Sequence, residues 1–193
     1  MTGTTRVTNA KPLIERAALE VFVSHGVDAA TTKLIAAQAG VSEGAMYRHF
    51  RSKDELAISL FMGVHKRLST LIEEAAAEAV GIRAKAAAIA RAYCQVADED
   101  WLLFSYHLTQ IHRFVPLYQE DGRDPVTTVE KIIKQAMIGA ELPPADPRVL
   151  AAMCIGVISQ TAQNKAYGRI GDDPLSAHCP LFTAAIEAVL FAR

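Results

Sequence analysis

The chain has 193 residues, enough for one large helical domain or two small ones. Apolar residues make up 51% and charged residues 21%, which is typical of a globular protein and argues against wholesale disorder. No apolar run approaches the roughly 20 residues that span a bilayer, and residues 1–11 lack a secretory signal, so we expect a cytoplasmic protein. The three widely spaced cysteines, Cys94, Cys154 and Cys179, are expected to be buried or free thiols in a reducing compartment.

Charge is distributed unevenly along the chain, although the net charge is only −1. Residues 1–53 hold seven lysines and arginines and four acids, whereas the rest holds thirteen basic and seventeen acidic residues. A basic head on an acidic body suggests that only the head meets a polyanion.

Three short helices are expected in the first fifty residues. Gly26 ends the first, Thr31 and Thr32 are candidate caps of the second, and Gly40 and Ser42 form the turn before the third. These helices run over residues 10–25, 33–39 and 43–49.

Residues 52–55 have the S-x-x-E form of a capping box and open a long fourth helix that continues to about residue 79. Prolines, glycines and acidic caps then separate helical patterns over residues 82–97, 98–112, 125–139, 147–167 and 181–192. No segment shows strand alternation. The sequence therefore predicts an all-α fold of about nine helices.

The second and third helices, joined by a three-residue turn, have the helix-turn-helix arrangement, whose last helix enters the major groove of DNA. Gly44 and Ala45 keep the tip of that helix slim, and Arg48 is long enough to reach guanine or phosphate. The free N–H groups at helix starts suit phosphate oxygens. A packing role for Tyr47 against the fourth helix is the alternative. The DNA-binding candidates are Thr31, Thr32, Lys33, Ser42, Glu43, Gly44, Ala45, Tyr47, Arg48, His49 and Lys53.

From Leu13 to Leu56 the segment resembles the DNA-binding domain of TetR-family regulators. The string TTKLIAAQAGVSEGAMYRHFRSKDEL is dense in the family's signature, with nothing inserted or missing. The resemblance covers about the first quarter of the chain, and beyond it only length and helix count agree. It implies an all-helical homodimer in which the first three helices bind DNA, the fourth leads to a ligand pocket in the middle helices, and the last two form a four-helix interface.

This resemblance divides the chain into a helix-turn-helix domain over 1–53, with the fourth helix (53–79) as connector, and a ligand-binding and dimerisation domain over 54–193. The stretch WLLFSYHLTQIHRF mixes aromatic surface with polar tips, as ligand sites do. Core packing is the alternative for each of its residues. The ligand-binding candidates are Phe61, His65, Tyr93, Trp101, Phe104, His107, Gln160 and Asn164.

A metal sensor using His65, His107 and His112 is a lesser alternative, because His107 and His112 are five apart and do not share a helical face cleanly. No required cofactor and no bound metal are expected. Apolar stripes on the last two helices suit either a dimer interface or an internal core. The interface candidates are Cys154, Ile158, Thr161, Phe182, Ile186, Val189 and Leu190.

The expected function is sequence-specific transcriptional regulation, with a homodimeric repressor released from a palindromic double-stranded DNA operator by a small-molecule effector. No catalytic spacing and no phosphate loop point to an enzyme. Two alternatives stay open, namely a helical ligand-binding dimer or an enzyme whose helix-turn-helix no longer reads DNA. The effector, the operator and its genes, and activation in place of repression are not decided by the sequence.

Overall fold

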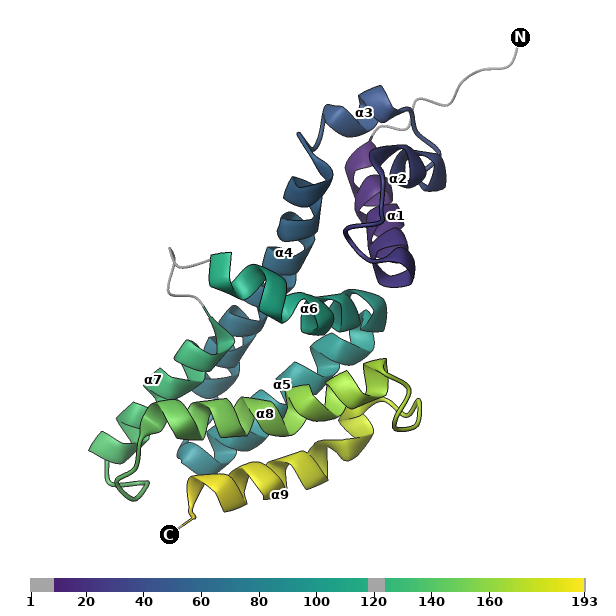
Figure 1. Cartoon of the computed structure of the whole chain (residues 1–193). Coiled ribbons are helices and arrows are strands. Elements are labelled where there is room, and N and C mark those ends of the chain that lie inside the picture. The colour runs from purple at the N-terminus through teal and green to yellow at the C-terminus, as the bar shows by residue number, and fades with distance from the viewer. Residues whose placement is uncertain (1–8, 118–123, 193) are drawn as a thin grey trace. The chain divides into compact units, whose positions relative to one another are not determined.

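The computed structural model describes residues 9–117 and 124–192, and every regular element within these ranges is a helix (Figure 1). The predicted all-α fold is therefore confirmed. The chain divides into two compact units, residues 1–62 and residues 63–193. Helix α4 (Lys53–Ala77) belongs partly to each. The division of functions at residue 53 stays a prediction.

The N-terminal unit contains α1 (Ala10–His25), α2 (Thr32–Gln38), α3 (Glu43–Tyr47) and the beginning of α4. Helices α2 and α3 pack against each other, and both pack against α1. Their buried apolar core takes most of its side chains from α1. It includes Ile14, Ile35, Met46, Phe50 and Leu56.

The predicted turn chemistry of the N-terminal unit is confirmed. Thr31 caps α2 by accepting the amide of Leu34 at 3.1 Å, and Ser42 caps α3 by accepting the amide of Ala45 at 3.1 Å. Gly40 has a φ of +66°, a left-handed conformation that glycine adopts without strain. Because these contacts are local, the residue types at these positions decide where α2 and α3 begin and where the turn between them lies.

The start of α4 also follows the sequence pattern, with one difference. Ser52 accepts the amide of Glu55 at 3.0 Å, as a capping box requires. The Glu55 carboxylate, however, accepts the amide of Arg51 at 2.6 Å. In a capping box, the Glu55 side chain would accept the amide of Ser52, the cap residue itself. Here it accepts the amide of the preceding residue.

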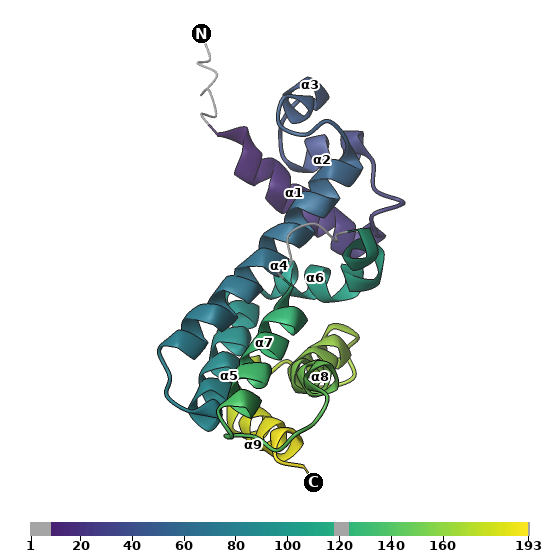
Figure 2. The same ribbon diagram turned by 90° about the vertical axis from the view of Figure 1, so that its left-hand side faces the viewer.

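The C-terminal unit contains the rest of α4 and the helices that follow it (Figure 2). Helix α7 packs along α8, and α9 packs against both α5 and α8. The buried cluster between them is almost entirely aliphatic, with Tyr93, Phe104 and Phe182 as its aromatic members. The remaining elements are α5 (Ile82–Glu99), α6 (Trp101–Phe114), η1 (Val115–Leu117), α7 (Pro125–Ile138), α8 (Pro147–Ala166), η2 (Leu175–His178) and α9 (Cys179–Leu190).

Two boundaries in this unit differ from the sequence pattern, for a shared reason. Helix α5 continues to Glu99, and α6 begins at Trp101, because Asp100 alone caps α6 through the amide of Leu103. Asp98 instead accepts the amides of Leu175 and Ser176, at 2.8 and 2.9 Å, and so fixes the start of η2. A long-range contact thus uses an acid that the local pattern assigns to a helix cap.

The three cysteines are buried and free, as predicted. Among the residues that the structure describes, no helix is both long enough and apolar enough to cross a membrane.

Candidate functional site

The exposed face of α3 and the residues after it carry most of the predicted DNA-binding side chains. Tyr47 is 51% exposed and therefore does not belong to the core of the N-terminal unit. Its packing against the fourth helix stays an alternative. Its hydroxyl donates to Thr32 Oγ1 at 3.4 Å, and Thr32 in turn donates to Glu43 Oε2 at 3.1 Å. This chain of hydrogen bonds joins α2 to α3 and orients the Tyr47 ring before any partner arrives.

Three exposed side chains of this face have room to meet phosphate or base edges. Lys33, Arg48 and His49 are exposed, and Arg48 forms no ion pair with any residue that the structure describes. Gly44 lies in the first turn of α3, where an added Cβ would meet only Ser42 Oγ at 3.9 Å. The tip of α3 is therefore slim, as a helix that enters a groove requires.

Besides the helix caps Thr31 and Ser42, two more of the predicted DNA-binding residues have structural roles. The Ala45 side chain is only 8% exposed because it faces the core of the N-terminal unit beside Met46, so its predicted DNA contact is corrected. Lys53 is half-buried, and its ammonium donates to the carbonyl of Asp28 at 3.0 Å. This bond ties the start of α4 to the loop between α1 and α2, a role that sequence reasoning missed.

Most of the predicted ligand-binding residues lie in one aromatic cluster of the C-terminal unit. The Phe104 ring meets Tyr93 edge-on at 5.5 Å between ring centroids, and it lies 6.2 Å from Trp101 and 6.4 Å from His107. Phe61 is buried within the N-terminal unit instead. On α8, Gln160 is exposed, and the side-chain amide of Asn164 donates to the backbone carbonyl of Gln160 at 2.8 Å.

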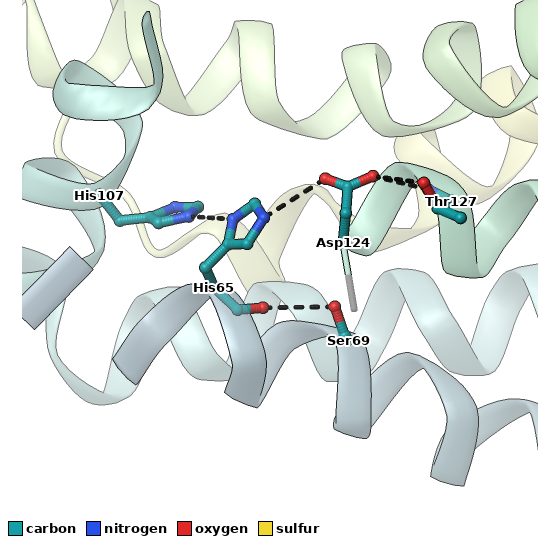
Figure 3. Close-up of polar contacts among 5 residues, drawn as sticks. All are labelled: His65, Ser69, His107, Asp124 and Thr127. Carbon is teal, nitrogen blue, oxygen red and sulfur yellow. Dashed lines mark hydrogen bonds and ion pairs between the residues drawn. The ribbon is translucent and has the colours of Figure 1, made fainter. Parts of the chain in front are cut away.

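A buried polar chain crosses the C-terminal unit (Figure 3). His65 on α4 lies with Nδ1 at 3.1 Å from His107 Nε2 on α6, and with Nε2 at 3.3 Å from Asp124 Oδ1. The other oxygen of Asp124 accepts the amide and hydroxyl of Thr127, at 2.8 and 3.0 Å, and so caps α7. When His65 is neutral, its Nε2–H donates a hydrogen bond to Asp124, and its Nδ1 accepts one from Nε2–H of His107. Three helices are thereby connected by one network.

Burial and hydrogen bonding set the pKa values of His107 and Asp124 in this polar network. Burial, reinforced by the nearby His65, lowers the pKa of His107 to about 3, so this imidazole is neutral at pH 7. Burial alone would raise the pKa of Asp124, but hydrogen bonds from His65 and Thr127 outweigh it and hold that pKa below its ordinary value. The network therefore holds a carboxylate beside uncharged His107.

The alternative metal site is not assembled. His112 is exposed on α6, whereas His65 and His107 are buried and bonded to each other. Within residues 9–117 and 124–192, no three His, Cys, Asp or Glu side chains are grouped so as to hold a metal ion.

A separate cavity of about 40 Å³ lies between α5, α7, α8 and α9. Among the described residues that line it, Tyr93 and Cys154 alone have polar side-chain atoms. Of the predicted ligand-binding residues, Tyr93 alone lines this cavity. The other lining residues could not be predicted, because aliphatic residues that line a cavity show the same sequence pattern as aliphatic residues that fill a core. The lining is completed by Ile82, Ala86, Ile89, Val129, Ile132, Ile133, Ile155, Ile158, Ile186 and Leu190.

The predicted dimer residues lie mostly in the interior of their own unit. A side chain that is covered by its own chain has no surface left for a partner, so this assignment is corrected for the five buried residues. Thr161 and Val189 are half-buried and remain predictions. The five buried residues are Cys154, Ile158, Phe182, Ile186 and Leu190.

The opposite faces of α8 and α9 expose apolar side chains. Val149 and Met153, one turn apart on α8, are 54% and 49% exposed, and Leu181 on α9 is 68% exposed. Ala184 and Ala188 continue the α9 face at helical spacing and are exposed too. The sequence pattern does not separate this face from the core face, because both sides of each helix are apolar.

Comparison with known proteins agrees with the geometry of the N-terminal unit. Residues 14–60 match the model of the family described as bacterial regulatory proteins, tetR family. The HTH-type transcriptional regulator SrpR of Pseudomonas putida is 58% identical over 40 residues, which are 21% of this chain and 19% of SrpR. The chain thus aligns with only a fifth of that relative's length.

Solved structures extend the similarity of fold along the chain. A bacterial regulatory protein of the tetR family from Rhodococcus RHA1 superposes with a TM-score of 0.77 at 20% identity, covering 97% of this chain and 100% of that one. The regulator FadR from Bacillus subtilis, solved in complex with stearoyl-CoA, gives a TM-score of 0.73 at 21% identity and covers 93% and 97%. The family match therefore covers residues 14–60, from α1 into α4, and along the rest of the chain the similarity to these solved structures is one of fold.

Proposed function

We propose that this protein is a sequence-specific DNA-binding transcriptional regulator that works as a homodimer and responds to a small molecule. The observation that carries the proposal is the exposed polar face of α3, with Tyr47 held by Thr32 and Glu43 and with Arg48 projecting beyond the helix. A helix with a slim tip and a cationic end matches the depth and the acceptors of the major groove.

A homodimer is supported by the uncovered face of Val149, Met153 and Leu181. One recognition helix reads only a few base pairs, whereas a twofold dimer reads two half-sites one helical turn apart. Small side chains at Ala184 and Ala188 allow close approach of a second copy. A palindromic operator follows from this symmetry.

The response to a small molecule is supported by the C-terminal unit. It holds an apolar cavity together with a polar chain that bonds α4 to α6 and α7. Since α4 continues into the N-terminal unit, a ligand that favours one arrangement of these helices would shift DNA affinity. A coupling of about 1–3 kcal/mol changes that affinity roughly 5- to 150-fold. Repression relieved by the ligand is the expected outcome, and an enzymatic role is not expected.

A gel-shift assay tests the proposal with duplexes that tile the region upstream of the protein's own gene. One or a few duplexes should be retarded in the presence of a large excess of unrelated DNA. A folded dimer that retards all duplexes equally, or none, contradicts the proposal and favours a ligand-binding dimer without DNA recognition.

The dimer face gives a separate prediction. Met153→Glu places a charge in the centre of the exposed apolar face, so we expect it to convert the dimer to a monomer and to weaken operator binding. Analytical ultracentrifugation at micromolar concentration measures the first effect. Val80→Glu is the matched control, because Val80 is almost fully exposed in the loop after α4. A Met153→Glu protein that remains dimeric would place the interface elsewhere.

A further inference from the structure

The apolar cavity is bounded at one end by a surface groove of about 240 Å³. Ile82 on α5 and Ile132 on α7 line both the cavity and the groove, so these two side chains are all that is shared by the two spaces. Lys85 and Lys131 line the groove. The two neighbouring spaces therefore differ in chemistry, because the cavity is apolar and the groove carries two lysines.

The apolar part is elongated along α5. Ile82, Ala86, Ile89 and Tyr93 line the cavity at helical spacing. Eleven residues at 1.5 Å each separate the first from the last, which gives a length of about 16 Å. The partner walls are branched aliphatic side chains of α7, α8 and α9. A lining of this length and composition accepts a hydrocarbon chain better than a compact polar molecule.

The two lysines of the groove are available to a ligand. Neither Lys85 nor Lys131 forms an ion pair with any residue in the described part of the chain. The one carboxylate of the groove, Glu141, accepts the amide of Ile82 at 2.7 Å. This carboxylate is thus engaged at the start of α5. The groove at the end of the cavity therefore holds two lysines against one carboxylate, and this excess of positive charge favours an anion.

We infer that the C-terminal unit binds an amphiphile, with its hydrocarbon chain between α5 and α7 and its anionic head group at Lys85 and Lys131. The inference rests on the proposed function and names the class of its effector. The cavity of about 40 Å³ is smaller than such a chain, so entry has to displace Ile82 and Ile132 and part α5 from α7. A ligand that binds only the parted arrangement has the differential affinity that a population shift requires.

Isothermal titration of the full-length protein, without DNA, tests the site with laurate as the probe. We expect saturable binding of laurate and weaker binding of lauryl alcohol, which has the same chain without the charge. Lys85→Ala/Lys131→Ala should weaken laurate binding about tenfold, the sum of two exposed ion pairs. Lys134→Ala, an exposed lysine of α7 outside the groove, is the matched control and should leave the affinity unchanged.

A second variant tests the chain end of the site. Ala86→Val adds two methyl groups inside the cavity and should reduce laurate binding at least tenfold, while circular dichroism shows that the protein is folded. Absence of laurate binding, or equal affinities of wild type, the double lysine variant and Ala86→Val, overturns the inference. Equal loss in Lys134→Ala overturns the assignment of the head group to the groove.

The anionic head group can be the carboxylate of a free fatty acid or the phosphates of an acyl-coenzyme A. Comparing the binding of laurate with that of lauroyl-CoA separates the two sources. Tighter binding of lauroyl-CoA than of laurate identifies a phosphate-bearing head, and tighter binding of laurate identifies a carboxylate. Binding of coenzyme A alone as tight as that of lauroyl-CoA overturns the role of the cavity. Because no DNA is present, laurate binding without any operator shift would refute the proposed function alone, and an operator shift without laurate binding would refute the ligand site alone.

Discussion

Replacing Arg48 by alanine is expected to weaken binding to operator DNA by about 1–3 kcal/mol, a loss of roughly 5- to 150-fold. The reason is geometric, because Arg48 directly follows α3, is exposed, and has no carboxylate partner among the described residues. A guanidinium in this place can donate two hydrogen bonds to a guanine edge, which alanine cannot replace. Fluorescence anisotropy with a labelled duplex measures the change.

Arg16→Ala is the control for this prediction. It removes the same charge from the same unit, but Arg16 lies on α1 and is paired with Glu20 at 3.5 Å. Its effect should be several-fold smaller and should vanish at higher salt. Equal losses for the two variants would mean that Arg48 contributes only to the general electrostatic attraction and that α3 does not read bases.

Acidification is expected to destabilise the C-terminal unit by about 2 kcal/mol between pH 7 and pH 5. His107 has a folded pKa of about 3, whereas an unfolded histidine titrates near 6.5. Below pH 6.5 the unfolded chain therefore binds a proton that the folded chain does not. Stability is fully present above pH 6.5 and is lost progressively as the pH falls toward 3. The lowered pKa of Asp124 acts in a more acidic window and adds little above pH 5.

Urea unfolding followed by the fluorescence of the single tryptophan, Trp101, measures this dependence, since Trp101 lies close to Phe104 in the same unit. His107→Gln is the informative variant, because its amide nitrogen can still donate to His65 but does not titrate. Its unfolding free energy should vary less between pH 7 and pH 5 than that of the wild type. A wild-type protein of constant stability in this range would show that folding does not lower the pKa of His107. An equally steep variant would show that other groups cause the pH dependence.

The N-terminal unit could be predicted from the sequence because its signals are local. Thr31, Ser42 and Gly40 each act on amides or dihedral angles within a few residues, so the caps and the turn between α2 and α3 follow directly from the residue types. The misassigned Ala45 shows the limit of this reasoning. In a helix of only five residues, neighbouring positions can share the buried side. Ala45 and Met46 are both buried, whereas the sequence pattern assigned Ala45 to the exposed side.

The C-terminal unit could be predicted only in outline, because its site depends on contacts between distant residues. Asp124 was expected to cap α7, and it does, but its second bond reaches His65, which is far away in the sequence. On α8 the pattern shows two apolar faces. Nothing local decides that Cys154 faces the core while Met153 faces solvent, since that choice is made by packing against α6, α7 and α9.

The central claim, that this protein reads a specific DNA sequence, is tested most directly by the ratio of two dissociation constants at physiological salt. One is measured for the upstream duplex found by gel shift, and the other for a duplex of the same composition in shuffled order. We expect the first to be roughly 10³-fold tighter or more, as for other sequence-specific DNA-binding proteins. Equal affinities of a folded, dimeric protein for the two duplexes would contradict the claim.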